Sequence, residues 1–278
     1  MKKILIFILV FLVIVLGVLV YSRFLGIRGL KTNEIVIHDN IPDSYDGLKI
    51  VHFADIHYKK VINESKVKKV VKEINSLEPD VVVFSGDLVD DDYELNNGDI
   101  NFLIKEFSSI DSKYGSYAVM GDQDMHNKET VRNIYIQSGF VLLENEATVI
   151  KNENNDKILL GGVLSSVSRK ADIRKTMETV KENVSYKIIL THEPDYVDSI
   201  LEYYSDVSLV LSSHSINGSI NIPIVKRFLL PKGAYAYFKP YYKINNTSLY
   251  ISNGIGVNDI NFRFFNTPSI NFYRLKKK

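Results

Sequence analysis

Asp55 and His57 are the first side chains along this chain whose types and spacing indicate metal chemistry. They follow Leu48–Phe53, which the sequence predicts as a buried strand. In α/β sheets the polar site forms at the carboxyl ends of strands, so a carboxylate and an imidazole two residues apart there can share one ion. Because such a pair also occurs by chance on loops, the interpretation requires further ligands elsewhere in the chain.

Four later strands are predicted to end in the same way, each followed closely by a carboxylate or an imidazole. These side chains are Asp87, Asp122, His192 and His214. Carboxylates and histidines that converge on one rim are costly to bury unless a cation neutralises them. The recurrence at successive strand ends therefore predicts a divalent metal site, and the absence of cysteine leaves it to nitrogen and oxygen ligands. Asp90 is interpreted as a structural residue of its loop.

The elements that must position these residues begin with a strand–helix–strand unit. Apolar residues at helical spacing predict an amphipathic helix with Asn63 or Ser65 as its N-cap and Pro79 at its end. The helix lies between the predicted strands 48–53 and 81–84, an order typical of a right-handed βαβ unit in a parallel sheet. Further helices are predicted over 100–107 and 129–137, and further strands over 117–120 and 140–143.

From Thr148 onward the predicted strands become shorter and alternate in polarity. They cover 148–151, 157–160, 188–190, 207–211, 219–222, 248–252 and 270–275, with a charged helix over 172–183. These strands are predicted to form a second sheet. The economical architecture is one α/β domain of two packed sheets with helices outside.

The amino terminus predicts a membrane anchor. Lys2 and Lys3 precede an unbroken apolar run from Ile4 to Val20, and the next charge is Arg23. At about 1.5 Å per residue this run crosses the hydrocarbon core of a bilayer. A cleaved signal peptide is the alternative, and the charges that flank the run do not decide its orientation. We predict an anchor over residues 1–22, a juxtamembrane linker over 23–33 and a folded domain over 34–278.

Composition narrows the classes of partner. Lys and Arg total 34 against 33 for Asp and Glu, which gives a net charge of +1. A chain so balanced, without a basic stripe, has no long-range field to attract nucleic acid. With no cysteine it also has no disulfide and no thiolate nucleophile. The predicted partners therefore exclude nucleic acid and include the membrane, through the N-terminal helix.

The order of these motifs resembles that of the calcineurin-like metallophosphoesterases over nearly all of residues 48–275. It consists of D-x-H at 55–57, G-D-x-x-D at 86–90, a segment like G-N-H at 121–123, a lone His192 before Glu-Pro-Asp, and a segment like G-H-x-H at 213–216. The tail over 250–268 resembles the ending of the membrane-associated branch of that family. The resemblance implies a four-layer αββα sandwich, an extracytoplasmic domain, and a phosphoesterase whose substrate is a phosphomonoester or phosphodiester, with a lipid-linked ester among the candidates.

The resemblance also implies two divalent metal ions, such as Mn, Fe or Zn, which clamp a phosphate and activate water. It assigns Asp55 and His57 to the first ion and Asp87 to both ions. His192 and His214 belong to the second ion, and Asp122 stands where the family has an asparagine that contacts it. A carboxylate there also binds metal. Asp87, Asp122 and Gln123 are accordingly the predicted catalytic residues.

Two positions depart from the family pattern. Gln123 stands where the family has a histidine that contacts the phosphate, and glutamine donates a hydrogen bond but transfers no proton. Ile216 replaces the histidine that ligates the first ion. His126, the nearest substitute for Gln123, is interpreted as a surface residue. Two alternatives therefore stay open. In the first, the site binds one ion instead of two. In the second, the protein is catalytically silent and binds a metal, a phosphate ligand or a protein partner without turnover.

Overall fold

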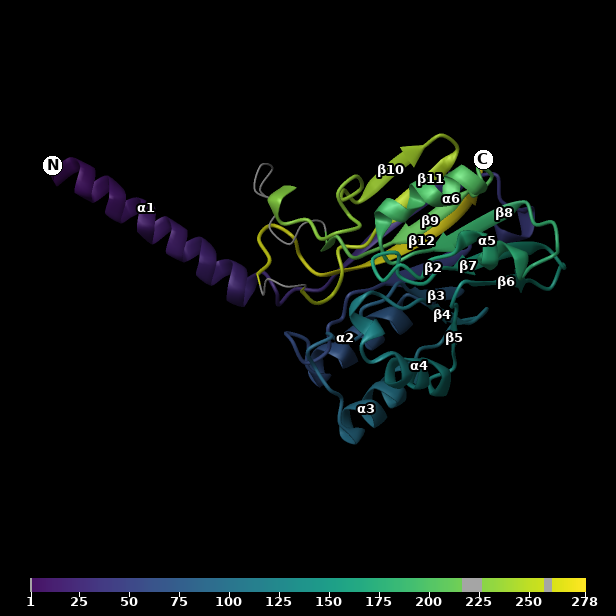
Figure 1. The fold of residues 1–278 in the computed structure, drawn as a ribbon, viewed down its shortest axis with the longest axis horizontal. Helices are drawn as coiled ribbons and strands as arrows, with labels where there is room; N and C mark the ends of the chain where they lie inside the picture. Colours follow the sequence, from purple (N-terminus) through teal and green to yellow (C-terminus); the bar gives the residue numbers. More distant parts are fainter. Residues whose placement is uncertain (1, 217–226, 258–261) are drawn as a thin grey trace.

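Two six-stranded sheets pack face to face in the computed structural model, which describes residues 2–216, 227–257 and 262–278. Helices cover the outer faces of both sheets (Figure 1). One apolar core lies between the sheets, and one lies under the helices on each side. These layers confirm the predicted αββα sandwich.

The first sheet has the strand order β1-β12-β2-β3-β4-β5. The bounds are β1 Lys31–Asp39, β12 Ser269–Lys277, β2 Lys49–Phe53, β3 Val81–Phe84, β4 Ser116–Ala118 and β5 Phe140–Leu142. Strands β2 to β5 run parallel, and β12 is antiparallel to β2. Strand β3 is apolar throughout because both of its faces are buried: Val82 packs under the helices and Val83 against the second sheet.

The second sheet has the strand order β10-β11-β9-β8-β7-β6. The bounds are β10 Tyr241–Ile244, β11 Thr247–Ile251, β9 Leu209–Ser212, β8 Tyr186–Leu190, β7 Lys157–Gly162 and β6 Glu146–Lys151. The four central strands run parallel, and β6 and β10 pair antiparallel at the edges. Both sheets therefore present parallel strand ends from which a polar site can be built.

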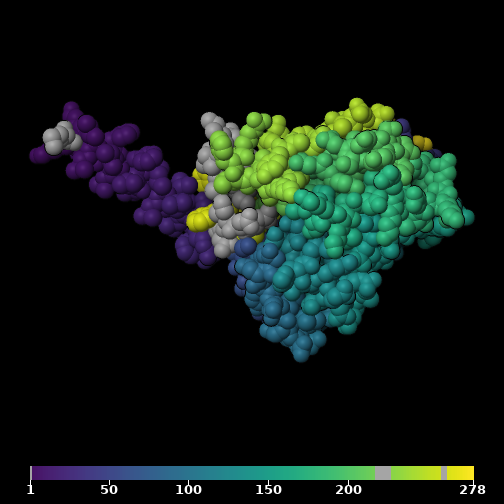
Figure 2. Space-filling view, viewed as in Figure 1, coloured from purple at the N-terminus to yellow at the C-terminus, as the bar shows by residue number. Residues whose placement is uncertain are grey.

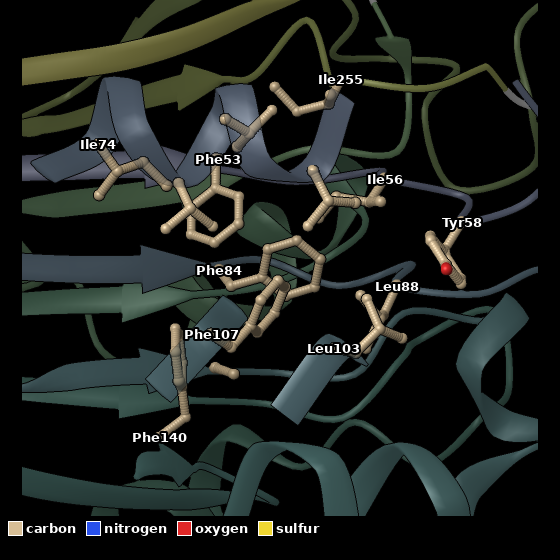
Figure 3. Close-up of a cluster of buried hydrophobic side chains, with 14 of the residues drawn as sticks. Phe53, Ile56, Tyr58, Ile74, Phe84, Leu88, Leu103, Phe107, Phe140 and Ile255 are labelled. Carbon is tan, nitrogen blue, oxygen red and sulfur yellow. The ribbon is translucent and has the colours of Figure 1, made fainter. Parts of the chain in front are cut away.

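Three helices cover the first sheet: α2 Glu64–Ser76, α3 Asn97–Ser108 and α4 Lys128–Gln137. The side chain of Asn63 caps α2 by accepting a hydrogen bond from the amide of Lys66, as one of the two predicted caps. Figure 3 shows Phe53, Phe84 and Phe107 meeting in the core beneath these helices. Two shorter helices, α5 Ile173–Glu178 and α6 Val197–Tyr203, pack on the second sheet, and short 3-10 turns cover Asp43–Tyr45, Gln123–Met125 and Pro194–Tyr196.

Several features of the described fold differ from the sequence predictions or extend them. The strand predicted over 270–275 was placed in the second sheet, which is wrong: β12 lies in the first sheet between β1 and β2. The helix predicted over 172–183 ends at Glu178, and α6 and β10 were not predicted. The strand predicted over 219–222 lies outside the described residues. Strand β1 begins at Lys31, within the segment predicted as a linker.

The N-terminal segment Lys2–Leu25 forms one helical rod, made of α1 Lys2–Val20 and a π-helical turn Tyr21–Leu25. It is long and apolar enough to cross a membrane, and 0% of its most apolar window is buried against the rest of the described chain. Figure 2 shows it standing clear of the domain, which is incompatible with a helix of the protein core. Its end is fixed to the domain, because the amide of Arg263 donates to the carbonyl of Ser22 at 3.0 Å.

The carboxyl ends of the central strands of the first sheet point toward α1. Strand β1 begins just after the N-terminal helix, and β12 starts beside it and runs parallel. Strand β2 runs antiparallel to β12, so it ends on the side where β1 begins. Figure 1 shows the C-terminus, where β12 ends, at the opposite end of the domain. Residues that follow β2 and β3 therefore lie on the side of the domain that carries the N-terminal helix.

Candidate metal centre

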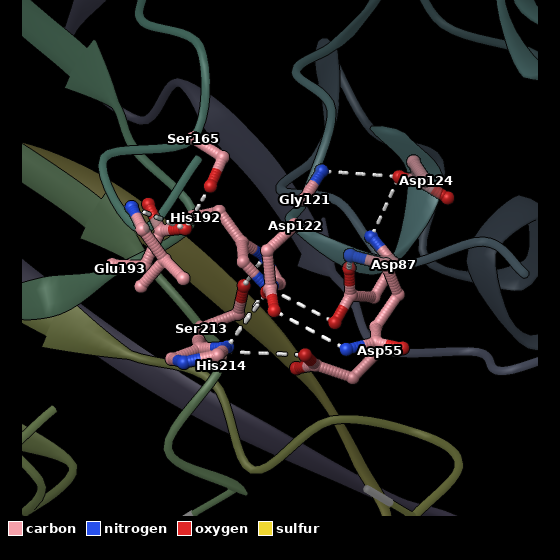
Figure 4. Close-up of polar contacts among 12 residues, drawn as sticks. Asp55, Asp87, Gly121, Asp122, Asp124, Ser165, His192, Glu193, Ser213 and His214 are labelled. Carbon is pink, nitrogen blue, oxygen red and sulfur yellow. Dashed lines mark hydrogen bonds and ion pairs between the residues drawn. The ribbon is translucent and has the colours of Figure 1, made fainter. Parts of the chain in front are cut away.

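All six predicted ligands converge. Figure 4 shows five of them, Asp55, Asp87, Asp122, His192 and His214, where the two sheets meet. They form two groups that share Asp87: one consists of Asp87, Asp122, His192 and His214, and the other of Asp55, His57 and Asp87. Within each group, one donor atom from every residue lies within 4.8 Å of all the others. We call these the four-donor group and the three-donor group. Every one of these residues was named from the sequence.

The four-donor group is compact. Nε2 of His192 lies 3.1 Å from Oδ2 of Asp87 and 3.3 Å from Oδ1 of Asp122. Nδ1 of His214 lies 3.2 Å from the same oxygen of Asp122. The other ring nitrogen of His192 lies 2.7 Å from the carbonyl oxygen of Ser85, which fixes the ring so that Nε2 faces the carboxylates.

The three-donor group is looser. Nε2 of His57 lies 3.7 Å from Oδ2 of Asp87, whereas Nδ1 is held at 2.8 Å by Oδ1 of Asp90. Asp90, which was predicted to be a structural residue of its loop, therefore orients the ring of His57, a predicted ligand. Oδ1 of Asp55 accepts a hydrogen bond from the amide of His214 at 3.2 Å.

Two buried atoms of the three-donor group favour the binding of a cation. Oδ2 of Asp55 and Nε2 of His57 are buried, and neither has a hydrogen-bond partner among the described residues. Buried polar atoms of this kind are rare unless something unseen satisfies them. Carboxylate oxygens and imidazole nitrogens are also the ligands that Mn, Fe and Zn accept. The residues present therefore fit a divalent metal ion.

Backbone conformation marks the same residues. Asp55, His57, Asp87 and His214 all have positive φ angles, between 47° and 63°, which non-glycine residues rarely adopt. Such strain costs on the order of 1 to 3 kcal/mol per residue and gathers at functional sites. The strained turns aim these side chains into the centre.

Gly121 makes room for the shared carboxylate. A Cβ atom at Gly121 would lie 2.0 Å from Oδ1 of Asp87, so a larger residue there would displace the carboxylate. Gly86, with φ at +101°, gives a tight turn before Asp87.

Electrostatics follow from burial and proximity. Burial raises the pKa of Asp55 to about 6, and the charge of Asp87 adds to this effect. Burial lowers the pKa of His192, but the charge of Asp87 and the hydrogen bond with Asp122 outweigh it and raise the pKa well above the ordinary value. Burial alone would raise the pKa of Asp122, yet its contacts with His192 and His214 hold it far below the ordinary range. In the absence of metal, the two histidines therefore act as the cationic partners of the carboxylates.

A cavity of about 180 Å³ opens onto this centre. Its lining includes Gln123, Lys232 and four predicted ligands, namely His57, Asp87, Asp122 and His214. The side chain of Gln123 donates to Oδ2 of Asp122 at 3.2 Å, so it lies where a bound phosphate group could meet it. The cavity can therefore admit a small anionic group next to the predicted ligands.

Ile216 and His126 lie elsewhere. Ile216 is fully buried and, although β-branched, has a φ of +42°; the side chain of Asn266 donates to its carbonyl oxygen. It supplies no donor atom to either group. His126 is exposed, as predicted for a surface histidine.

Two buried carboxylates that support the centre were missed in the sequence. Asp124 accepts hydrogen bonds from the amides of Asp87 at 2.8 Å and Gly121 at 3.0 Å, and so ties the end of β3 to that of β4. Glu193 accepts from the amide of Ser166 at 2.8 Å and holds the loop that reaches the cavity. Each lies within two residues of a predicted ligand, and that adjacency was the available signal.

Comparison with known proteins gives related sequences. Residues 48–218 match the family described as calcineurin-like phosphoesterase. The chain is 27% identical over 261 residues to the uncharacterized metallophosphoesterase YkuE of Bacillus subtilis. That alignment covers 92% of this chain and 89% of YkuE. It is 28% identical over 241 residues to the transmembrane protein with metallophosphoesterase domain of Bos taurus, which covers 81% of this chain and 52% of that protein.

The relatives differ in length. The chain is 29% identical over 238 residues to an uncharacterized metallophosphoesterase of Helicobacter pylori. That alignment covers 83% of this chain but 60% of the other protein. Among solved structures, the calcineurin-like phosphoesterase YfkN of Bacillus subtilis aligns with a TM-score of 0.47 and 13% identity. That alignment covers 75% of this chain and 81% of the other.

Proposed function

This chain belongs to the calcineurin-like phosphoesterase family, and from that premise we propose that it is a membrane-anchored, metal-dependent phosphoesterase. The match confirms the family predicted from the order of motifs. The proposed reaction is hydrolysis of a phosphomonoester or phosphodiester. The observation that carries the proposal is the convergence of three carboxylates and three histidines around buried atoms that lack partners.

The roles of the residues follow from their positions. Asp87 is the proposed ligand common to both groups, and the other five residues of the two groups are proposed to complete them. A divalent ion bound in such a site polarises a phosphoryl oxygen and makes water a stronger nucleophile at neutral pH. Gln123 is proposed to hold the phosphate by donating a hydrogen bond, because its amide lies at the cavity and offers no transferable proton.

The substrate class is proposed from the side on which the centre lies. The amide of Gly256 donates to the carbonyl of Asp55 at 2.6 Å, and the side chain of Arg263 donates to the carbonyl of Gly256 at 2.8 Å. The amide of Arg263 in turn donates to Ser22, at the end of the N-terminal helix. Three hydrogen bonds therefore connect a proposed ligand to the proposed anchor, which supports a phosphate ester presented at the bilayer surface.

Turnover of an activated aryl phosphodiester tests the proposal. The full chain in detergent micelles with added manganese is expected to hydrolyse it, and Asp87→Ala is expected to lower the rate more than about 100-fold, because even outer partners of ligands cost 10- to 100-fold. A matched control is Asp91→Ala, which removes an exposed carboxylate next to the same loop. Equal rates for the unaltered chain and Asp87→Ala would contradict the proposal.

Gln123 and Ile216 favour a second candidate, a pseudo-enzyme that binds without turnover. Lost general-acid help typically costs 10²- to 10⁴-fold in rate, and Ile216 supplies no ligand. The test is the double reversion Gln123→His with Ile216→His. Activity that appears only in the reverted chain supports the pseudo-enzyme, whereas ready turnover by the unaltered chain rejects it.

Placement of the domain outside the cytoplasm is part of the proposal, as are the anchor over 1–22, the linker over 23–33 and the domain over 34–278. The resemblance to the membrane-associated branch supports this placement. Protease added to intact cells is expected to remove the domain. Protection of the domain until the cells are lysed would place it in the cytoplasm.

A further inference from the structure

A cavity and a groove lie next to each other where the N-terminal helix joins the domain. The first, the juxtamembrane cavity, has a volume of about 290 Å³ and lies between residues 27–30 and the beginning of α2. The second, the lysine groove, has a volume of about 680 Å³ and follows the exposed side of α2 along Lys59, Lys68, Lys69 and Lys72. Lys69 lines both. In Figure 1, α2 lies on the side of the domain that carries α1.

Positive charge exceeds negative charge here, although Lys59 pairs with Asp99 at 2.8 Å. Arg28, Lys66 and Lys69 line the juxtamembrane cavity, and its described lining contains no acidic residue. The lysine groove has Glu64 as the acidic residue of its described lining. Burial lowers the pKa of Lys66, and the nearby charges of Arg28, Arg263 and Lys69 lower it further. Every one of these neighbours is a cation, so an anionic ligand would relieve their mutual repulsion.

The walls of the juxtamembrane cavity are held in place. Nζ of Lys66 donates to the carbonyl of Ile27 at 3.4 Å and to that of Val61 at 2.9 Å, which joins the segment after the membrane helix to the start of α2. Val70 and Ile255 add apolar surface to the lining. Cations beside apolar side chains match a phospholipid, which carries a phosphate next to its apolar chains.

The position of this face places it near a bilayer. Arg28 follows Leu25, the last residue of the helical rod, by three residues, which is at most about 10 Å of extended chain. Phe24 and Phe265 are 52% and 70% exposed on the same part of the molecule, where Tyr21 packs edge to face on Phe264 with ring centroids 6.0 Å apart. Exposed aromatic side chains at the end of a membrane helix are typical of the membrane interface.

We propose that this face binds an anionic phospholipid, with the phosphate of its headgroup in the juxtamembrane cavity among Arg28, Lys66 and Lys69. The lysine groove then lies against the negative surface of the same leaflet. Binding fixes the domain against the bilayer with the metal centre on the membrane side. The site needs neither metal nor turnover, so its failure would leave the proposed phosphoesterase activity untouched.

Native mass spectrometry of the full chain, released from neutral detergent with equal amounts of phosphatidylglycerol and phosphatidylcholine of matched acyl chains, tests the proposal. The chain is expected to retain phosphatidylglycerol preferentially. Arg28→Gln combined with Lys69→Gln is expected to weaken that binding roughly 30-fold, since each cation near an anionic surface contributes about 1 kcal/mol and 1.4 kcal/mol is tenfold. Both side chains are exposed, so the variant should melt at the same temperature as the unaltered chain.

The matched control is Lys170→Gln combined with Lys181→Gln, which removes the same charge from exposed positions away from α2. It is expected to bind phosphatidylglycerol as the unaltered chain does, and millimolar inorganic phosphate is expected to leave the lipid bound. Equal retention of the two lipids, or equal weakening in both double variants, would overturn the proposal. Displacement of the lipid by inorganic phosphate would overturn the lipid assignment, since it would show a site for free phosphate.

Discussion

The four-donor and three-donor groups share Asp87 but differ in completeness. In the four-donor group every residue reaches another within 3.3 Å, whereas the closest approach of His57 to Asp87 is 3.7 Å. Ile216 stands where the resemblance places a ligand of the three-donor group. The four-donor group instead carries a carboxylate, Asp122, where the resemblance implies a neutral amide. Relative to the pattern that the resemblance implies, the four-donor group has therefore gained a negative charge and the three-donor group has lost a neutral donor.

The difference indicates how metal affinity divides between the two groups. A group with four donors, including two carboxylates and two histidines, offers a nearly complete coordination shell. The three-donor group offers one donor residue fewer, and the buried guanidinium of Arg263 adds positive charge near Asp55. A second cation there meets fewer ligands and more repulsion. We expect one tightly held ion and one weakly held ion.

Removal of one histidine from each group should give the largest contrast. His192→Ala is expected to release the tight ion, with an affinity loss of more than about 100-fold, because this exceeds the effect of losing a partner of a ligand. His57→Ala is expected to leave the tight ion bound. Manganese remaining after dialysis, measured by elemental analysis, checks both variants. Equal loss of metal in the two variants would show that the groups do not differ.

Asp90→Asn should affect the three-donor group alone. Asp90 holds Nδ1 of His57 at 2.8 Å, and loss of such a partner typically weakens metal binding by about 10- to 100-fold. The weak ion is therefore expected to bind less well, with the tight ion unchanged, in a titration against a competing chelator. Asp92→Asn, at an exposed position in the same loop, is the control. A weakened tight ion in Asp90→Asn would contradict the assignment.

The metal-free chain should lose stability as the pH rises. Burial raises the pKa of Asp55 to about 6 and that of Asp124 to about 7, in both cases with help from Asp87. The folded chain then binds protons more strongly than the unfolded chain, so folding stability falls as the pH rises through these values. The raised pKa of His192 acts in the same direction, since its stabilising charge is present at low pH and is lost at high pH.

We expect the melting temperature of the metal-free chain to be several degrees lower at pH 8 than at pH 5, since about 1 kcal/mol moves it by about 2 to 4 °C in a domain of this size. Circular dichroism measures it. Added manganese should reduce the difference, because the ion replaces the protons. Asp55→Asn should also reduce it. A metal-free chain that melts higher at pH 8 would contradict the electrostatic account.

Ile216→His should give the smallest effect and the most informative one. It offers the missing ligand and replaces a β-branched residue at a φ of +42°, which relieves strain on the order of 1 kcal/mol. The affinity of the weak ion is expected to rise, with the tight ion unchanged, in the same chelator titration. Ile216→Leu, which removes the β-branch without adding a ligand, separates strain from ligation. Equal gains in both variants would assign the effect to strain alone.

The convergence of the six predicted ligands could be anticipated because each follows an apolar strand, and parallel strands deliver their ends to one rim. Asp55, Asp87 and Asp122 come from three neighbouring strands of one sheet, and His192 and His214 come from the other. Local pattern sufficed for these positions. It also gave the helices over the first sheet, since their apolar faces repeat at helical spacing.

The local pattern did not predict which distant strands pair, or which buried carboxylates hold the loops of the centre. Strand β12 reads like its neighbours in sequence, yet its partners β1 and β2 lie more than two hundred residues earlier. Asp124 and Glu193 look like loop carboxylates, and only the fold shows that backbone amides surround them. In the sequence, the lysines of α2 resemble the solvent-exposed face of any amphipathic helix. Only the fold places them near residues 27–30, which follow the membrane helix.

Calorimetric titration of the full, unaltered, metal-free chain with manganese tests the central claim most directly, because it counts the ions and ranks their affinities. The asymmetry of the two groups predicts two steps: a tight step with one ion per chain and a second step at least about 10-fold weaker. A single step with two equivalent ions per chain would contradict the account, and so would the absence of any tight step.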